Sequence, residues 1–284
     1  MVVDQAIMQT IVYSDIFSYP LTLVEIHQFL IEKSISKKLL KKHLSKLVSE
    51  AKIENLGVFF FLPKREKIVD VRIKRQKITR PKILVAKKFA GLISKIPSVI
   101  MIGLTGALAV GNSDSKDDID FFIVCQSNTV WLTRFLVTVV LTLLGQRRLP
   151  NSKKNKDKIC LNMFIDQNSL KFKQSLYMAH EIAQLKPLFD RGIYRQIWTK
   201  NKWVFKYLPN FKQLQHKDLP TIRYRFEFHD LTFIIWEKLL KSFQILYMKR
   251  RRTIEEISDS IIRFHPNDAS IWVEREFQKR LAVL

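Results

Sequence analysis

The chain has 284 residues, of which 47% are hydrophobic and 11% aromatic, and it contains only 7 glycines and 9 prolines. This composition excludes a disordered or low-complexity chain and supplies enough apolar side chains for two or three folded domains. Lysine and arginine number 49 against 26 acidic residues, a formal net charge of +23. Such an excess favours polyanionic partners, with nucleic acid or a nucleotide first. The alternative explanation is that the basic composition reflects the host's proteome or serves solubility.

Residues 1–63 have the pattern of three helices followed by a β-hairpin. The first helix precedes Pro20, Thr22 is placed to cap the second helix, and the third covers residues 34–52. Two short strands are expected on either side of a turn at 55–57. Three helices and a hairpin in this order are typical of a winged helix-turn-helix unit, which often binds DNA.

The third of these helices has a sharply divided surface. At about 100° per residue, the apolar half contains Leu39, Leu40, Leu44 and Leu47, and the other half contains Lys37, Lys38, Lys41, Lys42 and Lys46. Lys38, Lys41 and Lys42 are the candidate nucleic-acid-binding residues, because a recognition helix turns such side chains toward phosphates. A merely solvated face, or a winged helix that binds another protein, would have the same pattern.

The remaining chain divides into a basic connector, an α/β domain and a helical domain. Residues 64–97 are basic and helical, and Pro81 is expected to divide them into two helices. The region that follows alternates strands and helices, with strands at 98–104, 118–124 and 159–165 and one helical turn within 106–112. The expected fold class is mixed α+β, made of a winged helix (1–63), a connector (64–97), a central mixed sheet with helices (98–170) and an all-helical C-terminal domain (171–284).

The cysteines and the longest apolar segment both indicate a cytoplasmic protein. Cys125 and Cys160 lie in apolar runs without CxxC spacing, so we expect buried free thiols in a reducing compartment, and neither a zinc site nor a disulfide. The N-terminal residues lack the basic stretch and the cleavage pattern of a signal peptide. Residues 130–145 are apolar, but this segment is shorter than the ~20 residues that a bilayer requires and contains Arg134. We therefore expect a buried helix there and no membrane partner.

Two aspartates at the start of the strand at 118–124 are the strongest chemical signal. Asp118 and Asp120 are two residues apart, so they project from the same face of the strand, where two carboxylates repel each other. A divalent cation removes that repulsion, and Mg²⁺ (or Mn²⁺) binds one or two carboxylates together with phosphate oxygens. The small residues of 105–111 would allow a triphosphate to approach the backbone.

Together these residues resemble the nucleotidyltransferase superfamily, whose palm is like that of DNA polymerase β. The family signature is a strand, a Gly-Ser turn, a short helix, and an Asp-x-Asp strand about twelve residues after the glycine; here Gly106, Asp118 and Asp120 match it. The resemblance covers 98–170 and implies an enzyme that binds an NTP, with Asp118 and Asp120 as metal ligands and catalytic residues for Mg²⁺ or Mn²⁺. The residues that it places at the phosphates are Thr105, Gly106 and Ala107.

Two positions depart from the family pattern. Ala107 stands where members usually have a phosphate-binding serine. Asn162 stands where the next strand carries a third carboxylate, and an amide cannot serve as a general base. Asp166 or Glu181 could take that role, although an ordinary surface charge is the simpler interpretation of Glu181. Arg134, in an apolar helix, is expected to pair with the carboxylates or with a phosphate.

Three functions fit this pattern. The first is transfer of a nucleoside monophosphate from an NTP to an acceptor, for which the net charge favours RNA or DNA over a small molecule. The second is a winged-helix regulator that binds nucleic acid and senses a nucleotide through a catalytically degenerate domain, which Ala107 and Asn162 favour. The third, the nucleotidyltransferase half of a toxin–antitoxin pair, fits less well because that group is usually small and single-domain. His180 and His265 are further candidate ligands for which structural roles are expected.

Overall fold

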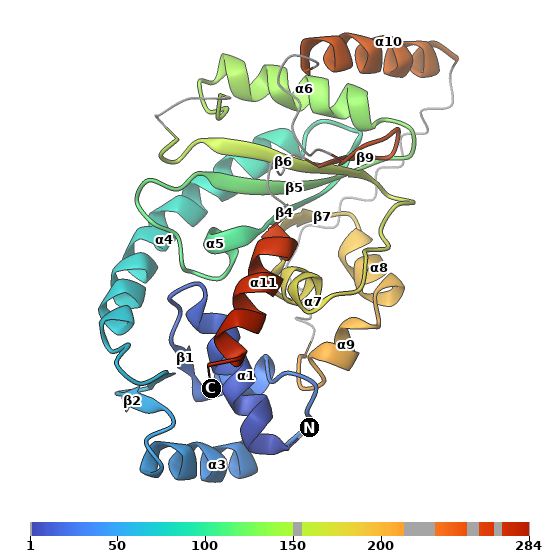
Figure 1. Cartoon of the computed structure of the whole chain (residues 1–284). Helices are drawn as coiled ribbons and strands as arrows, with labels where there is room; N and C mark the ends of the chain where they lie inside the picture. Colours follow the sequence, from blue (N-terminus) through green and yellow to red (C-terminus); the bar gives the residue numbers. More distant parts are fainter. Residues whose placement is uncertain (1, 150–154, 213–230, 249–255, 264–268, 284) are drawn as a thin grey trace.

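A computed structural model describes residues 2–149, 155–212, 231–248, 256–263 and 269–283, and within these ranges the side chains of 162, 231–234, 248 and 256 are not described. The fold is mixed α/β, with helices on both faces of a six-stranded mixed sheet and a smaller N-terminal unit of helices and short strands beside it (Figure 1). None of the described helices is both long enough and apolar enough to cross a membrane.

The central sheet has the strand order β7-β4-β5-β6-β9-β8. β5 and β6 run parallel, and every other neighbouring pair is antiparallel. The three strands predicted within 98–170 are confirmed as β4, β5 and β6. The strands span Val99–Leu104 (β4), Ile119–Cys125 (β5), Ile159–Asp166 (β6), Lys186–Asp190 (β7), Glu256–Ile257 (β8) and Ile261–Arg263 (β9).

Alternation along β5 divides the core between the two faces of the sheet. Phe121 and Ile123 belong to a cluster with α4 and α6, whereas Phe122 and Val124 belong to a cluster with α7, α8 and α9. Burial on both faces makes β5 the centre of the domain. The helices span Lys67–Ile93 (α4), Val130–Leu143 (α6), Leu176–Gln184 (α7), Ile193–Lys200 (α8) and Val204–Tyr207 (α9).

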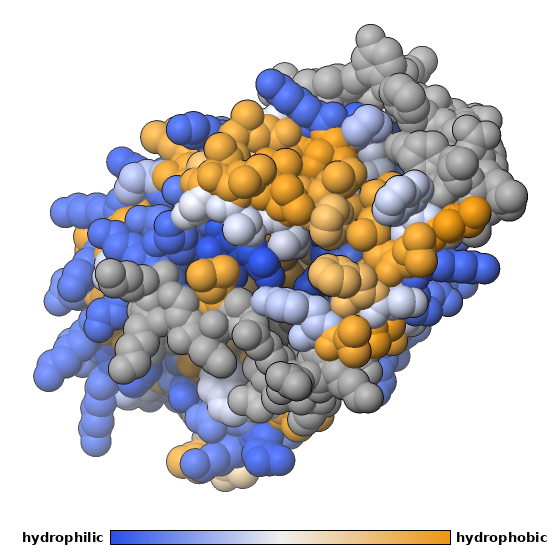
Figure 2. Space-filling view, turned by 90° about the horizontal axis from the view of Figure 1, so that it is seen from above, coloured by the Kyte–Doolittle hydropathy of each residue, from blue (hydrophilic) through white to orange (hydrophobic). Residues whose placement is uncertain are grey.

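The helix predicted at 130–145 is α6, and it is buried on one side only. Trp131, Val137 and Leu141 are buried, whereas Leu143 is 82% exposed. α10 (Leu231–Met248) packs against α6, and apolar side chains gather over these two helices on the face seen in Figure 2. The exposed apolar side chains of α10 are Ile235, Trp236, Leu239, Phe243, Leu246 and Tyr247.

The prediction of an all-helical domain at 171–284 is wrong. β7, β8 and β9 lie within that range, and they extend the sheet at both of its edges. β7 follows α7 after a single residue, Leu185, so its sequence resembles the end of a helical pattern. The other two strands have two and three residues, which is too short for a period-two signal. The sheet therefore extends beyond 98–170.

The prediction that Pro81 divides the connector into two helices is also wrong. α4 is a single helix of 27 residues with Pro81 inside it. A proline in a helix interior removes one backbone hydrogen bond, but packing holds the helix together on both sides of it, because Thr79, Lys82 and Ala86 are buried. Lys82 donates to the backbone carbonyl of Asp117. α4 thereby supports the loop that leads to β5.

The N-terminal unit contains the three helices and the hairpin predicted for 1–63. Thr22 caps the second helix as expected, in a capping box with Glu25. Leu40, Leu44 and Leu47 of the third helix are buried, whereas Leu39, predicted for the same apolar half, is 40% exposed. The elements are α1 (Val3–Asp15), β1 (Leu21–Thr22), α2 (Leu23–Gln28), α3 (Lys37–Ser49), β2 (Glu54–Leu56) and β3 (Phe59–Phe61), and the strands form a small sheet of order β1-β3-β2.

Specific contacts hold this unit against the rest of the chain. Arg72 of α4 is buried and pairs with Glu25 at 2.7 Å. Asn112, in the loop after α5 (Gly106–Ala109), donates its side-chain N–H to the carbonyl of Phe17 at 3.0 Å. The last helix, α11 (Ala269–Leu281), returns to pack beside α1 (Figure 1). The end of α1 and the start of α11 therefore lie beside the short helix α5.

Candidate functional site

The two aspartates predicted to bind metal lie at the amino end of β5. Asp118 directly precedes the strand and Asp120 is its second residue. The side chain of Asp120 has the parity of Phe122, which faces α7, whereas Ile119 is fully buried on the opposite face. Both carboxylates are partly buried. The expectation that Asp118 and Asp120 project together is thereby confirmed, since their oxygens approach within 4.8 Å.

Cys160 completes this cluster, which we name the Asp–Cys cluster (Asp118, Asp120 and Cys160). The parallel pairing of β5 with β6 sets Cys160 opposite Asp120, and the ligand atoms of the three residues all lie within 4.8 Å of one another. Cys160 is a free thiol, as expected, but it is partly exposed and not buried. Cys125 is buried and free, as expected.

Burial and the nearby charge of Asp118 both favour the protonated form of Asp120. Burial, and then the charge of Asp118, raise the pKa of Asp120 to about 7. Arg148 offsets part of this repulsion, because it donates to Oδ2 of Asp118 at 2.5 Å and lies 3.5 Å from Sγ of Cys160. Burial and both aspartates raise the pKa of the Cys160 thiol. A divalent cation would favour the ionised form of all three groups.

The turn at Gly106 brings backbone directly against Asp120. Gly106 has a φ of +63°, a conformation that favours glycine, and a Cβ there would lie 3.1 Å from Oδ2 of Asp120. Gly106 and Ala107 are exposed, and the N–H of Thr105 donates to the backbone carbonyl of Asp120 at 3.3 Å. The three residues predicted at the phosphates thus lie beside the Asp–Cys cluster.

The donor set fits a divalent cation. Two carboxylates supply the hard oxygen ligands that Mg²⁺ and Mn²⁺ prefer. The thiol of Cys160 is a softer ligand, and it binds metal only as the thiolate. Asp118 and Asp120 are therefore the primary metal-binding candidates. Cys160, the third residue of the cluster, offers sulfur and not oxygen.

Among the candidates for the third acidic position, the structure brings Glu181 toward the pair and not Asp166. Asp166 is opposite Cys125 at the far end of the parallel strands, and it accepts hydrogen bonds from two backbone N–H groups there. Asn162 lies on β6, but its side chain is outside the described part of the structure. Glu181 extends from α7, and its charge is near enough to raise the pKa of Asp120.

The environment of Glu181 differs from that of an ordinary surface charge. Burial raises its pKa to about 7, and the charge of Arg263 and a hydrogen bond with Tyr177 lower it in part. Its side chain is partly buried and lines two cavities, one of them shared with Thr105 and the other with Gly106. Glu181 is therefore more buried than an ordinary surface charge. Near neutral pH this carboxyl could both accept and release a proton.

Arg134 is not part of this site. It lies in the first half of α6, where its guanidinium donates to the side chain of Gln244 on α10. The loop from β5 to α6 leaves the carboxyl end of β5, whereas Asp118 and Asp120 are at the amino end. Of the two partners expected for Arg134, the carboxylates are therefore ruled out, because α6 begins beyond the opposite end of β5.

The lysine face of α3 is exposed, as its pattern predicts. Lys38, Lys41 and Lys42 are all exposed, while the leucines at 40, 44 and 47 are buried beneath them. α3 lies at the end of the N-terminal unit that is farthest from the central sheet (Figure 1). The candidate nucleic-acid face and the Asp–Cys cluster are therefore on different parts of the molecule.

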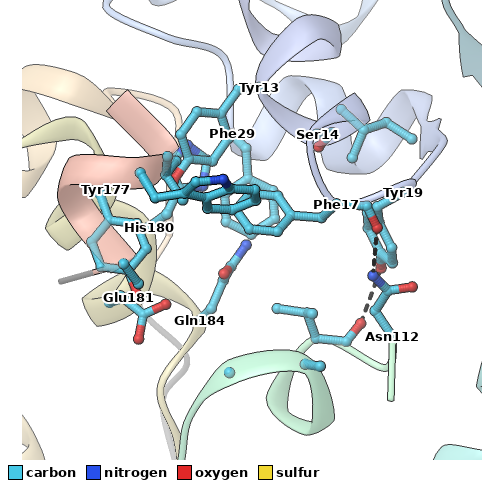
Figure 3. A pocket seen from close by; sticks show the side chains of 17 residues that line it. Tyr13, Ser14, Phe17, Tyr19, Phe29, Asn112, Tyr177, His180, Glu181 and Gln184 are labelled. Carbon is cyan, nitrogen blue, oxygen red and sulfur yellow. Dashed lines mark hydrogen bonds between the residues drawn. The ribbon is translucent and has the colours of Figure 1, made fainter. Parts of the chain in front are cut away.

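An aromatic cavity of about 190 Å³ adjoins the Gly106–Ala107 turn. Side chains from α1 and α7 gather around it in Figure 3, and Trp272 of α11 completes its wall. His180 is buried there, with its ring stacked on Tyr13 at 4.2 Å and on Phe29 at 5.5 Å between centroids. The sequence offered the spacing of α7 residues at 177, 180, 181 and 184, one face of a helix, but not the partners of that face. His265, the other histidine considered, lies outside the described residues.

The Asp–Cys cluster, the glycine turn and the aromatic cavity are contiguous, because Gly106 lies beside Asp120 and also lines the cavity. Their residues come from elements spread over most of the chain, including α1, α5, β5, β6, α7 and α11. Comparison of this chain with protein-family models, with curated protein sequences and with solved structures finds no significant match.

Proposed function

We propose that this chain is a divalent-metal-dependent nucleotidyltransferase, which moves a nucleoside monophosphate from an NTP to an acceptor hydroxyl. The observation that carries the proposal is the convergence of Asp118, Asp120 and Cys160 within 4.8 Å, beside a glycine turn whose backbone reaches Asp120. In this proposal residues 1–63 act as a winged helix and residues 98–170 as the core of a polymerase-β-like palm.

Each residue of the site then has a distinct role. Asp118 and Asp120 would hold Mg²⁺ or Mn²⁺, which would stabilise the negative charge of the phosphates during transfer. The backbone of the turn from Thr105 to Ala107 would lie along the polyphosphate. Glu181, whose pKa burial raises to about 7, would accept the proton of the acceptor hydroxyl. The acceptor oxygen forms a bond to the α-phosphorus, and the bond between the α-phosphorus and the pyrophosphate oxygen breaks.

Nucleic acid is the acceptor that the charge distribution favours. The formal net charge is +23, and the exposed lysines of α3 present several positive charges on one helix face. Such a face binds phosphates irrespective of base sequence, so it would hold RNA or DNA while a terminal hydroxyl reaches the metal cluster.

The test is nucleotide transfer from α-³²P-labelled NTPs, each supplied with Mg²⁺ or Mn²⁺ and with bulk RNA or DNA. We expect label in the nucleic acid and release of pyrophosphate, both abolished by EDTA and by Asp118→Asn or Asp120→Asn. Asp114→Asn is the matched control, because Asp114 is in the same loop but outside the Asp–Cys cluster. Unchanged labelling in both cluster variants would refute the proposal.

A nucleotide-sensing regulator is the second candidate, and two residues favour it. Ala107 has no hydroxyl for a phosphate, and Asn162 stands where the family carries a third carboxylate. Such a protein would bind NTP and metal at the same site without turnover, and would bind DNA through its N-terminal unit. A DNA affinity that changes on adding NTP, with no release of pyrophosphate, would favour the regulator over the enzyme.

A further inference from the structure

The aromatic cavity beside α5 is lined by side chains that suit a flat ring. Phe29 and Tyr13 line its interior, and Phe17 and Trp272 form a rim that is 37% and 53% exposed. These two rim rings lie edge to face, with centroids 6.4 Å apart. At about 190 Å³ the cavity exceeds the ~150 Å³ that accommodates benzene in an engineered protein cavity. Flat faces with an exposed rim suit a planar ligand that enters from solvent.

His180 provides a second and independent indication that a polar ligand belongs here. The side chain is 5% exposed, and neither ring nitrogen has a hydrogen-bond partner among the described residues. Buried polar atoms are nearly always hydrogen-bonded, so an imidazole with both nitrogens unpaired needs a partner. Neutral imidazole offers one donor and one acceptor. Gln184, four residues further along α7, adds an amide to the same cavity (Figure 3).

The position of the cavity relates its ligand to the Asp–Cys cluster. Gly106 and Ala107 form part of the cavity wall, and Gly106 also lies against Asp120. A molecule with a flat ring in the cavity could therefore extend past the turn to the metal cluster. A nucleotide has this shape, with a heteroaromatic base at one end and phosphates at the other.

We propose that the cavity binds the base of a nucleotide, with Tyr13, Phe29 and Trp272 providing ring contacts and His180 hydrogen-bonding the base edge. Its extension to a triphosphate rests on the proposed function, whereas binding of the base alone does not. The site is thus assembled from α1, α7 and α11 around α5, so that the N-terminal unit contributes directly to nucleotide recognition.

The experiment compares ligands with and without a base, using calorimetry on the full chain with Mn²⁺ present. The ligands are the four NTPs, the four nucleosides and inorganic tripolyphosphate. His180→Phe keeps the stacked ring and removes both nitrogens, and Trp272→Ala removes the rim. Trp236→Ala is the control, because Trp236 is 58% exposed on α10. We expect the first two variants to weaken binding of the preferred NTP by about tenfold or more, and to leave tripolyphosphate binding unchanged.

The outcomes separate this inference from the proposed function. If NTP binds and neither cavity variant weakens it, or if tripolyphosphate binds as tightly as every NTP, the base does not occupy the cavity. If the variants weaken nucleoside and NTP binding but Asp120→Asn has no effect on NTP binding or transfer, the cavity is a base site and the metal proposal fails. A parent protein that binds none of the nucleosides or nucleotides overturns the inference.

Discussion

Gly106 lies against the carboxylate of Asp120 so closely that a Cβ atom would stand 3.1 Å from Oδ2. The glycine also has a φ of +63°, which side chains other than hydrogen disfavour. One residue thus fixes both the path of the turn and the space beside the Asp–Cys cluster. This contact gives a prediction that separates backbone strain from damage to the site.

Gly106→Ala should weaken Mn²⁺ binding by about tenfold, because the new methyl group would crowd Oδ2 of Asp120 and force the carboxylate to shift. Gly111→Ala is the control, since Gly111 has a φ of +80° in the same loop, but a methyl group added there would meet no atom within 4 Å. Both variants should lose about 1 kcal/mol of unfolding free energy through backbone strain. Mn²⁺ titration followed by electron paramagnetic resonance measures the affinity, and equal affinities in the two variants would contradict the prediction.

Cys160→Asp should strengthen Mg²⁺ binding, because it places a third carboxylate opposite Asp120 on the neighbouring strand. We expect about a tenfold gain in Mg²⁺ affinity, together with a loss of stability without metal, because three carboxylates would then repel one another. Cys160→Asn has a similar size without the charge and should show neither effect. Calorimetry with Mg²⁺ and thermal unfolding with EDTA measure both. If the Asp and Asn variants bind Mg²⁺ equally, Cys160 does not face the metal position.

The pairing of Asp118 with Asp120 could be predicted from the sequence, and the third member of the Asp–Cys cluster could not. Asp118 and Asp120 stand out because a two-residue spacing on an apolar strand puts both on one face. The position of Cys160 depends on how β5 and β6 align, and that register contains an irregularity between Asp120 and Phe122. A register between strands 40 residues apart is set by tertiary packing, which leaves no local pattern.

The aromatic cavity and the outer strands could not be predicted from the sequence for a related reason. The cavity combines α1, near the start of the chain, with α11, near its end, and no local period relates Tyr13 to Trp272. β8 and β9 are very short, and β7 directly follows a helix, so pairing with neighbouring strands defines all three more than a local pattern does. The helices and strands with long apolar periods, such as α3 and β5, were predicted correctly because their own sequences specify them.

Replacing Lys38, Lys41 and Lys42 by glutamine should weaken binding to duplex DNA without changing NTP binding. If all three contact phosphates, the slope of log affinity against log salt should become shallower by about 2.7. The triple variant Lys200→Gln, Lys202→Gln and Lys206→Gln removes the same charge from exposed positions elsewhere. Fluorescence anisotropy at several salt concentrations makes the comparison. Equal slopes in the two triple variants would show that the α3 face is merely solvated.

Arg72→Met should destabilise the fold, because Glu25 would lose its partner in a largely buried pair. Burial tends to raise the pKa of Glu25, but the hydrogen bond and charge of Arg72 hold it below its usual value. Arg72 also lies over the ring of Tyr19, a cavity residue, at 4.1 Å. We expect a loss of about 3 kcal/mol in urea unfolding.

Lys46→Met is the control for the Arg72 prediction, because the Lys46–Asp4 pair has a lysine that is 54% exposed. Exposed pairs contribute little, so this variant should unfold close to the parent's midpoint. Adding Glu25→Gln to Arg72→Met should recover part of the lost stability, since no unpaired charge would remain. Equal destabilisation by Arg72→Met and Lys46→Met would mean that the Arg72–Glu25 pair does not hold the N-terminal unit in place.

His180 should make folding stability depend on pH below neutrality. Burial lowers the pKa of His180 from 6.5 to about 3. Between these values the unfolded chain binds a proton that the folded chain does not, so this residue's contribution to stability decreases as the pH falls. Asp120 and Glu181, whose pKa values are raised to about 7, act in the opposite direction, because the folded state holds their protons more tightly.

Comparison with His180→Phe isolates the histidine, since the carboxyl groups remain in both proteins. The variant should gain about 2 kcal/mol of unfolding free energy relative to the parent between pH 7 and pH 5. Urea unfolding at intervals of half a pH unit would measure the difference. If the two proteins keep a constant difference over this range, His180 is protonated in the folded state at pH 5, and the aromatic cavity must then supply a hydrogen-bond acceptor or an anionic partner to its ring.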